Sequence, residues 1–387
     1  MFSKDKVSET LTNSLSTDNL FANNSHKLII SNLSDKLLSR LTTGFILTCM
    51  FLFITTLNIY PQMTSGGFAA SYLQRHAGVR AASMSGAFTA ISNDATAVFY
   101  NPAGISFLSS KPTINSSVSM IGLGQTHSTI AWAQRIHPRI GIGIGINSLN
   151  SGGFQGRDVQ GNTTTMLQDW QYSMFLSAAY RLESVSVGAT VKYLKHNLLG
   201  SNIYSTGTAV DLGAKFDIFN MFSVGIAVQN FGSQVFWSEA TPGDGSLNEA
   251  LPYNVRAGIA MEFGLNDEYI TQRSPKTGKL ETIYLPPTQY ILVDFDAVMY
   301  QFDENPRLMM GAEAVIDDRL ALRAGLTIWG EDLGMEKLFP FNNWGTGISI
   351  RPDIAGFPFR TVIDYSVNRE LINTSGISHN IGLSLEF

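Results

Sequence analysis

The chain has 387 residues, enough for one large barrel or about two or three ordinary domains. Charged residues make up 15%, against roughly 25% in a typical soluble domain, and hydrophobic residues make up 44%, too few for a bundle of membrane-spanning helices. The net charge is −5 and no basic stripe runs along the chain, which argues against nucleic acid as a partner.

The longest apolar stretch runs from Leu41 to Ile59 and follows two cations, Lys36 and Arg40. A positive region followed by a short apolar core predicts an export signal, here at 41–62. The alternative, a transmembrane anchor, needs about 20 apolar residues. Because five threonines and an asparagine interrupt this stretch, the signal is favoured. Residues 1–40 are polar and lack periodicity, so we expect a disordered extension there.

The only cysteine, Cys49, lies inside this apolar stretch. Removal of the signal would leave an exported chain without disulfides or thiolate metal sites, which suits an oxidising location.

Between the signal and the first predicted strand lies a segment, 63–112, that is rich in Ala, Ser and Gly. Asn101-Pro102 predicts a turn and Gly104 permits a close bend. A segment of small residues can fit inside a large barrel, which encloses more space than its own side chains fill.

From Thr113 onward, segments of about ten residues alternate apolar with small or polar side chains, as in a transmembrane β-barrel. In one of them, Ile140, Ile142, Ile144 and Ile146 alternate with glycines and Asn147. We predict a closed antiparallel, all-β barrel over 113–387, whose strands lie near 113–120, 127–135, 140–150, 170–181, 185–196, 206–216, 222–231, 255–263, 289–300, 307–315, 320–328, 345–351, 359–367 and 378–387. Fourteen is an even number, as expected for a single-chain barrel of the cell outer membrane.

The connections between these segments are alternately long and short. If the last strand ends in the periplasm, Ser151–Asp169, Gly232–Asn254 and Trp329–Trp344 are long external loops. Gly264–Thr288 breaks the rule, because it is long but falls on the periplasmic side. It is either a true insertion or a sign that the strand count slips there.

Charged residues share the face of the small residues in their strands. A charge that faces lipid near the bilayer centre costs a few kcal/mol, so these side chains should point into the lumen and pair there. They either fill the interior as ion pairs or line a channel or ligand site. The predicted lumen network comprises Lys192, Asp211, Lys215, Glu313, Arg323 and Asp364.

The last strand ends in Leu385 and the terminal Phe387. A final aromatic residue on an amphipathic strand resembles the signal read by the barrel assembly machinery, although an edge strand can end in Phe by chance. We expect that machinery and outer-membrane lipid as partners.

No zinc-protease, P-loop or nucleophile-elbow motif is present, and the histidines are scattered without ligand spacing. The glycines of Gly141–Gly145 lie on one strand face and lack the strand–turn–helix setting of a nucleotide loop. We therefore expect no enzyme, no catalytic residues, no cofactor and no metal.

Several stretches resemble the PorV/PorQ family, which is itself similar to FadL-type transporters, and together the resemblance covers about residues 66–387. They are Asn93-Asp94-Ala95, Phe99-Tyr100 and Asn101–Gly104 near the N-terminus, and later Val187–Tyr193, Asp211–Ala214, Val228–Gly232 and Leu320–Gly325. The residues before Asn93 depart from the best-known members, so the PorV and PorQ subgroups both stay open.

The resemblance implies a fourteen-stranded barrel with a plug or hatch in or near the lumen, formed here by Phe99, Asn101, Pro102, Ala103, Gly104 and Phe107. It also implies a role in type IX secretion, in which the barrel binds secreted cargo or secretion-system proteins and passes the cargo on. The alternative is a FadL-like transporter of hydrophobic small molecules, in which a ligand leaves through the side wall. A purely structural barrel is a third hypothesis.

Overall fold

Residues 61–387 form one compact unit of the chain, and the computed structural model describes most of this unit. The predicted extension and export signal lie outside the described residues, as do residues 239–247 and 250 of the loop Gly232–Asn254 and residues 329–342 of the loop Trp329–Trp344. The start of Gly232–Asn254 was wrongly predicted as loop, because β7 continues to Trp237. The described ranges are 69–201, 203–218, 221–238, 248–249, 251–266, 268–273, 280–285, 287–301, 305–328, 343–352, 359–369 and 376–387.

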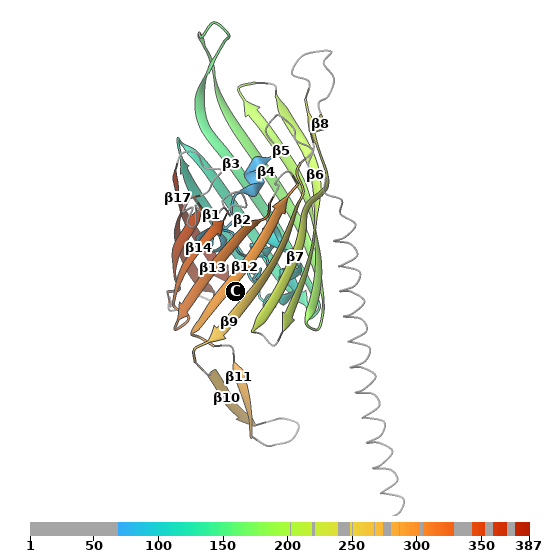
Figure 1. Ribbon diagram of the computed structural model, residues 1–387, viewed down its shortest axis with the longest axis vertical. Coiled ribbons are helices and arrows are strands. Elements are labelled where there is room, and N and C mark those ends of the chain that lie inside the picture. Colours follow the sequence, from blue (N-terminus) through green and yellow to red (C-terminus); the bar gives the residue numbers. More distant parts are fainter. Residues whose placement is uncertain are drawn as a thin grey trace, which may run out of the picture. The chain divides into compact units, whose positions relative to one another are not determined.

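Fourteen of the described strands form one closed antiparallel ring, which confirms the predicted fold class (Figure 1). Each strand pairs with its neighbours, and β1 closes the ring against β17 from Thr113 opposite Glu386 to Met120 opposite His379. The ring contains β1 (Thr113–Gly122), β2 (Gln125–His137), β3 (Ile140–Arg157), β4 (Thr163–Leu182), β5 (Val185–Leu199), β6 (Tyr204–Ile218), β7 (Phe222–Trp237), β9 (Asn254–Gly264), β12 (Tyr290–Tyr300), β13 (Arg307–Ile316), β14 (Leu320–Ile328), β15 (Trp344–Ile350), β16 (Arg360–Arg369) and β17 (Ile377–Glu386).

Three further strands lie outside this ring. The short β8 (Asn248–Glu249) pairs with the last part of β7. β10 (Glu268–Arg273) and β11 (Leu280–Leu285) form a separate hairpin between β9 and β12. The hairpin explains the long connection Gly264–Thr288: it is a true insertion, and the strand count does not slip there.

One predicted loop is largely wrong. Ser151–Asp169 is mostly strand, because β3 and β4 continue through it and leave only a short turn at 158–162. A register shift between Asn150 and Gly153 precedes the extra pairs. The sequence there is polar and glycine-containing, so the apolar alternation that revealed the other strands is missing although the backbone still pairs.

The two faces of the ring differ as the alternation predicts. Ile144, Leu176 and Ile259 point outward and are 50–64% exposed, whereas the charged Lys192 and Arg323 point inward and are 3% and 5% exposed. An apolar outer face and a polar interior on a closed sheet are the properties of a transmembrane barrel, since closure leaves no unpaired strand edge in the lipid. The chain is therefore an integral protein of the cell outer membrane.

The residues before β1 form what we call the inner segment, 69–112. Its second helix packs against the inner faces of β14 to β17 and its last against those of β2 to β6, so the segment lies inside the ring. None of the helices in the described ranges has the length and apolarity of a membrane span. The helices are η1 (Ser71–Gln74), α2 (Val79–Ser83), α3 (Ala97–Tyr100) and η2 (Pro102–Phe107).

The outward face can be tested with a charge near mid-height. Leu176→Arg should lower the free energy of unfolding by about 2–4 kcal/mol, because the guanidinium must enter hydrocarbon. Met166→Arg is the control, since Met166 lies on the same strand in the part of β4 beyond the predicted membrane-spanning length, and should cost roughly 1 kcal/mol or less. Urea unfolding in lipid vesicles measures both, and equal costs would contradict the membrane assignment.

Candidate functional site

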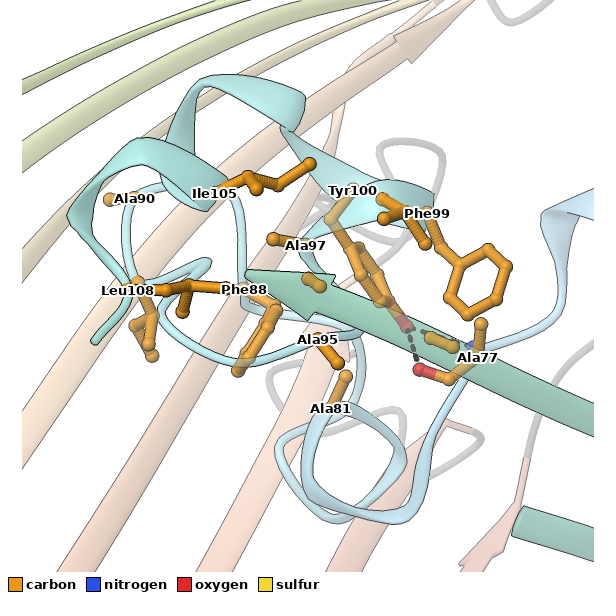
Figure 2. Close-up of a cluster of buried hydrophobic side chains, with 14 of the residues drawn as sticks. Ala77, Ala81, Phe88, Ala90, Ala95, Ala97, Phe99, Tyr100, Ile105 and Leu108 are labelled. Atoms are coloured by element: carbon orange, nitrogen blue, oxygen red, sulfur yellow. Dashed lines mark hydrogen bonds between the residues drawn. The ribbon is translucent and has the colours of Figure 1, made fainter. Parts of the chain in front are cut away.

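The inner segment fills the middle of the ring. From Arg75 to Ser106 every residue is buried except Arg80, Asn93 and Asp94. Figure 2 shows its apolar side chains gathered around Tyr100, whose hydroxyl bonds the backbone of Ala77 at 2.9 and 3.1 Å. Nine of the nineteen buried residues of this cluster are alanine, so the segment folds back on itself at short range and leaves little internal volume.

Glycines in the wall let the inner segment approach the strands closely. A Cβ atom at Gly141 would lie 2.7 Å from the backbone of Ile105, and one at Gly188 would lie 2.5 Å from the backbone nitrogen of Ala103. Real Cβ atoms do not come that near, so only glycine fits at these inward positions. The glycine run of β3 thus has a packing role against the segment.

The residues predicted as plug or hatch all lie in this segment. Asn101 donates to the carbonyl oxygens of Thr89 (3.1 Å) and Ala214 (3.0 Å), so it joins two parts of the segment to β6. Its Oδ1 accepts a hydrogen bond from the backbone nitrogen of Ala103 (3.2 Å), so Asn101 caps the N-terminus of η2. Pro102 is the first residue of that helix. Gly104 packs against the backbone of Ser92.

The two aromatic residues of that prediction lie apart. Phe99 makes an edge contact with Phe175 of β4, with ring centres 4.9 Å apart. Phe107 is half-buried at the end of η2, and the guanidinium of Arg181 lies over its ring at 4.6 Å. The predicted set is therefore a stretch of packing contacts around Asn101, with Phe107 at its edge.

Three of the predicted lumen charges form a chain of ion pairs that begins at the carboxylate of Glu313. Glu313 pairs with Arg323 on β14, and Arg323 pairs in turn with Asp364 on β16 at 3.1 Å. Glu313 also accepts two hydrogen bonds from Arg80 of the inner segment, at 2.8 and 2.9 Å. Burial lowers the pKa of the Arg80 guanidinium, but Glu313, Tyr290 and Asp94 together outweigh burial and raise that pKa well above its usual value. This carboxylate therefore ties the segment to the wall.

A second carboxylate holds the other side of the segment. Asp296 of β12 accepts hydrogen bonds from the backbone nitrogens of Phe88 (3.0 Å) and Thr89 (2.9 Å). Arg256 of β9 bonds the hydroxyl of Thr89 (2.9 Å) and pairs with Asp296 at 3.3 Å. The predicted Lys215 donates to the carbonyl oxygen of Ile91. Wall charges thus satisfy backbone groups of the segment that have no secondary structure of their own.

The remaining two predicted charges lie where the wall is irregular. Thr208 to Leu212 of β6 lie opposite Gln234 to Val228 of β7, so β7 holds two extra residues there. Asn230 and Gly232 have positive φ, 61° and 62°. From this point β7 no longer pairs with β9, whose ladder ends at Gln229 opposite Asn254.

Side chains close the break that this irregularity leaves. Lys192 pairs with Asp211 at 2.8 Å and donates to Asn230 Oδ1 at 2.8 Å. Asp211 accepts from the Asn230 backbone nitrogen at 2.8 Å, and the Asn230 amide donates to the carbonyl oxygen of Pro252 at 3.1 Å. Ser233 bonds the carbonyl oxygen of Leu251 at 2.8 Å. We call this place the β7 break; here side chains replace the backbone ladder.

A small cavity of about 30 Å³ lies beside the β7 break. Its lining mixes cationic, amide and apolar groups: Arg75, His76, Lys192, Arg256, Gln74, Asn147, Gln229, Asn230, Leu73, Ala77, Phe99, Tyr100, Phe175, Tyr300 and Met309. Two larger polar cavities, about 530 and 400 Å³, share Asn93 and Glu262 and lie at the end of the ring with the short turns. Within the described ranges, no three His, Cys, Asp or Glu side chains are placed to hold a metal.

Sequence patterns missed two residues of this site. Arg80 is a lone cation in a small-residue segment, and its partner Glu313 lies 233 positions away. Asn230 falls inside a predicted strand, and Gly232 two residues later was the only local sign of a bulge.

The C-terminal residues lie on the outer face of the ring. Leu385 pairs with Ile114 of β1 and Thr361 of β16, and Phe387 contacts the ring of Phe359 at 5.4 Å. Their recognition by the assembly machinery stays a prediction.

The model of an uncharacterised protein family, UPF0164, matches residues 58–209. A search of curated protein sequences finds no match. Similar solved structures include the toluene transporter TbuX of Ralstonia pickettii, with 16% identity over 80% of this chain and 97% of that chain and a TM-score of 0.45. The Pseudomonas putida toluene transporter TodX has 12% identity over 80% and 96%, with a TM-score of 0.48. A FadL homologue of Pseudomonas aeruginosa has 11% identity over 80% and 97%, with a TM-score of 0.45. The resemblance to PorV/PorQ proteins stays a prediction.

The tie at Glu313 can be tested by removing its charge. Glu313→Gln should lower the free energy of unfolding by about 3–5 kcal/mol, because buried Arg80 and Arg323 lose their shared carboxylate. Glu386→Gln is the matched control, since Glu386 faces Arg360 at the exposed rim and such pairs contribute little. Urea unfolding in vesicles gives both values, and a Glu313 variant as stable as the control would exclude the tie.

Proposed function

We propose that this protein lets small hydrophobic molecules cross the outer membrane, with the inner segment as a movable hatch and the β7 break as a side exit. The break next to the small cavity is the observation that carries the proposal. A side exit leads into hydrocarbon, so an apolar solute gains free energy by leaving there, whereas a polar solute does not.

The inner surfaces beside the break suit such a solute. An apolar cluster of Leu194, Ala209, Val235 and Leu251, with Leu73 and Trp237 against it, lies on the side toward β8. Phe99, Phe175 and Met309 line the cavity itself. Since the inner segment packs against the wall on all sides, a solute passes only when part of that segment moves.

The exit also has a physical means of opening. A backbone ladder resists separation through many parallel hydrogen bonds, but the β7 break is closed by single bonds from Asn230 and Ser233 to the 251–252 segment. Breaking these bonds leaves the ladders β6–β7 and β9–β12 intact. Two solved structures with a similar fold are named toluene transporters, and toluene is a small hydrophobic solute.

A disulfide across the break tests the exit. In Ser233→Cys with Leu251→Cys, oxidation should reduce uptake of radiolabelled naphthalene by expressing cells to that of cells without the protein, and reduction should restore it. The control is Ala178→Cys with Ala189→Cys, which lie directly opposite in the regular β4–β5 ladder and should not change uptake. Unchanged uptake in the oxidised 233–251 variant would rule out this exit.

A second candidate is the type IX secretion role, in which the barrel holds cargo or a surface partner. One observation favours it: β3 and β4 run for 18 and 20 residues, whereas a strand crosses the membrane with about 9–11. The extra part exposes Phe154, Val159 and Met166 beyond the membrane-spanning length. Exposed apolar side chains on a paired hairpin are suited to contact with another protein.

Shortening the hairpin separates the two functions. Replacing residues 151–169 by an Asn-Gly turn should abolish surface attachment of exported proteins and leave naphthalene uptake unchanged if the hairpin is the docking surface. Surface proteins can be counted by mass spectrometry after cell-surface labelling. Normal attachment in this variant, and in a strain without the gene, would contradict the secretion role.

A further inference from the structure

One buried carboxyl group of the wall has no hydrogen-bond partner. Asp294 points inward from β12 and is 0% exposed. Neither of its side-chain oxygens accepts a hydrogen bond from any residue that the structure describes. A buried carboxylate without donors is costly, so Asp294 differs in kind from its neighbours. The other buried carboxyl groups of the described strands all have donors: Asp211, Asp296, Glu313 and Asp364.

Two cations lie near Asp294, Lys215 on β6 and Arg256 on β9, but neither forms an ion pair with it. Lys215 donates to the carbonyl oxygen of Ile91, and Arg256 pairs with Asp296 at 3.3 Å. An ionised Asp294 would therefore lie in the interior without a contacting cation.

Other acidic groups also lie near Lys215. Asp217 and Glu262 are close to its ammonium, so this one cation faces three carboxyl groups. Both line the polar cavity of about 530 Å³, where water can stabilise their charges. Arg80 and Glu313 face the same region from the inner segment and β13, and they are paired with each other at 2.8 Å. The fully buried carboxyl group of β12 is therefore the one whose ionisation costs most.

A second acidic residue lies beside Asp294. Asp294 and Asp296 occupy successive inward positions of β12, so their side chains lie on the same face of the strand. Oδ2 of Asp296 accepts from the backbone nitrogens of Phe88 and Thr89, whereas its Oδ1 has no donor among the described residues. Two ionised carboxylates side by side repel each other in a low dielectric, so such pairs hold one proton between them. A neutral Asp294 would supply the donor that Asp296 Oδ1 lacks.

We propose that Asp294 is a neutral carboxylic acid in the folded protein, and that its proton completes the contact between β12 and the inner segment. Its hydroxyl donates to Oδ1 of Asp296, whose other oxygen holds the backbone of Phe88 and Thr89. Loss of the proton places two like charges on neighbouring inward positions and weakens that hold. The inner segment is thus bound to the wall by a contact that depends on pH. This inference does not rest on the transport proposed above.

Urea unfolding in lipid vesicles at several pH values tests the proton. An unfolded chain releases an aspartate proton at roughly pH 4, so between about pH 5 and 7 the folded chain should hold one proton more than the unfolded chain. The unfolding equilibrium constant of the unaltered protein, divided by that of Asp294→Asn, should therefore rise about tenfold per pH unit in this range. Asparagine has the shape of the neutral acid and can donate to Asp296, so the variant should fold.

Asp364→Asn is the matched control, because Asp364 is also a buried inward aspartate but pairs with Arg323 at 3.1 Å. The corresponding ratio should not rise with pH, since a carboxylate paired with a guanidinium is ionised in the folded and the unfolded chain alike over this range. A ratio for Asp294→Asn that is equally independent of pH overturns the proposal.

A second measurement needs no variant. When the unaltered protein is labelled with carbon-13 at the aspartate side-chain carboxyl, one resonance should keep the chemical shift of a neutral acid near pH 7, well above the roughly pH 4 at which an ordinary aspartate ionises. If every aspartate resonance has the shift of an ionised carboxylate at that pH, the proposal is overturned, even if Asp294→Asn does not fold.

Discussion

The width of the ring is the constraint on which the rest of the structure depends. Fourteen strands enclose a lumen that inward side chains alone do not fill, and an apolar outer face gives the strands no reason to collapse inward. The inner segment fills this space with closely packed backbone rather than with large side chains. That solution requires small residues on both sides, which is why Ala103 and Ala90 of the segment lie near the wall glycines Gly188 and Gly225.

Filling a lumen with irregular backbone creates a second demand, because buried N–H and carbonyl groups must find partners. Here the wall supplies them through side chains: Asp296 accepts from two successive backbone nitrogens, and Lys215 and Gln229 donate to carbonyl oxygens. The charges that make the interior polar therefore hold the segment as well as fill space.

At the β7 break, side-chain hydrogen bonds likewise replace the hydrogen bonds of the backbone ladder. Two extra residues in β7 turn Asn230 inward, and its amide, with Lys192 and Asp211, takes over the bonding that the strands give up. This closure by a few side-chain bonds next to a cavity is the reason for proposing the β7 break as the side exit. The proposed exit for hydrophobic molecules depends on Lys192, which pairs with Asp211 and donates to Asn230 at the break.

The sequence alone determined the ring. A period of two is a local property, so the number of strands, the faces of Leu176 and Lys192, and the outer-membrane location could all be predicted without knowing which strands meet. It also predicted that Asn101 and its neighbours lie in a small-residue segment able to fit inside the barrel, because small residues and a turn are local signals too.

Only the tertiary structure decided which groups meet across the lumen. The pairing of Glu313 with Arg80, the insertion hairpin β10–β11 and the break at Asn230 depend on closure and register around the whole ring. The length of β3 and β4 was missed for a related reason. Outside the membrane a strand needs only a pairing partner, so its sequence need not alternate apolar with polar residues. Sequence periodicity reports what a side chain faces, but not which distant side chain faces it.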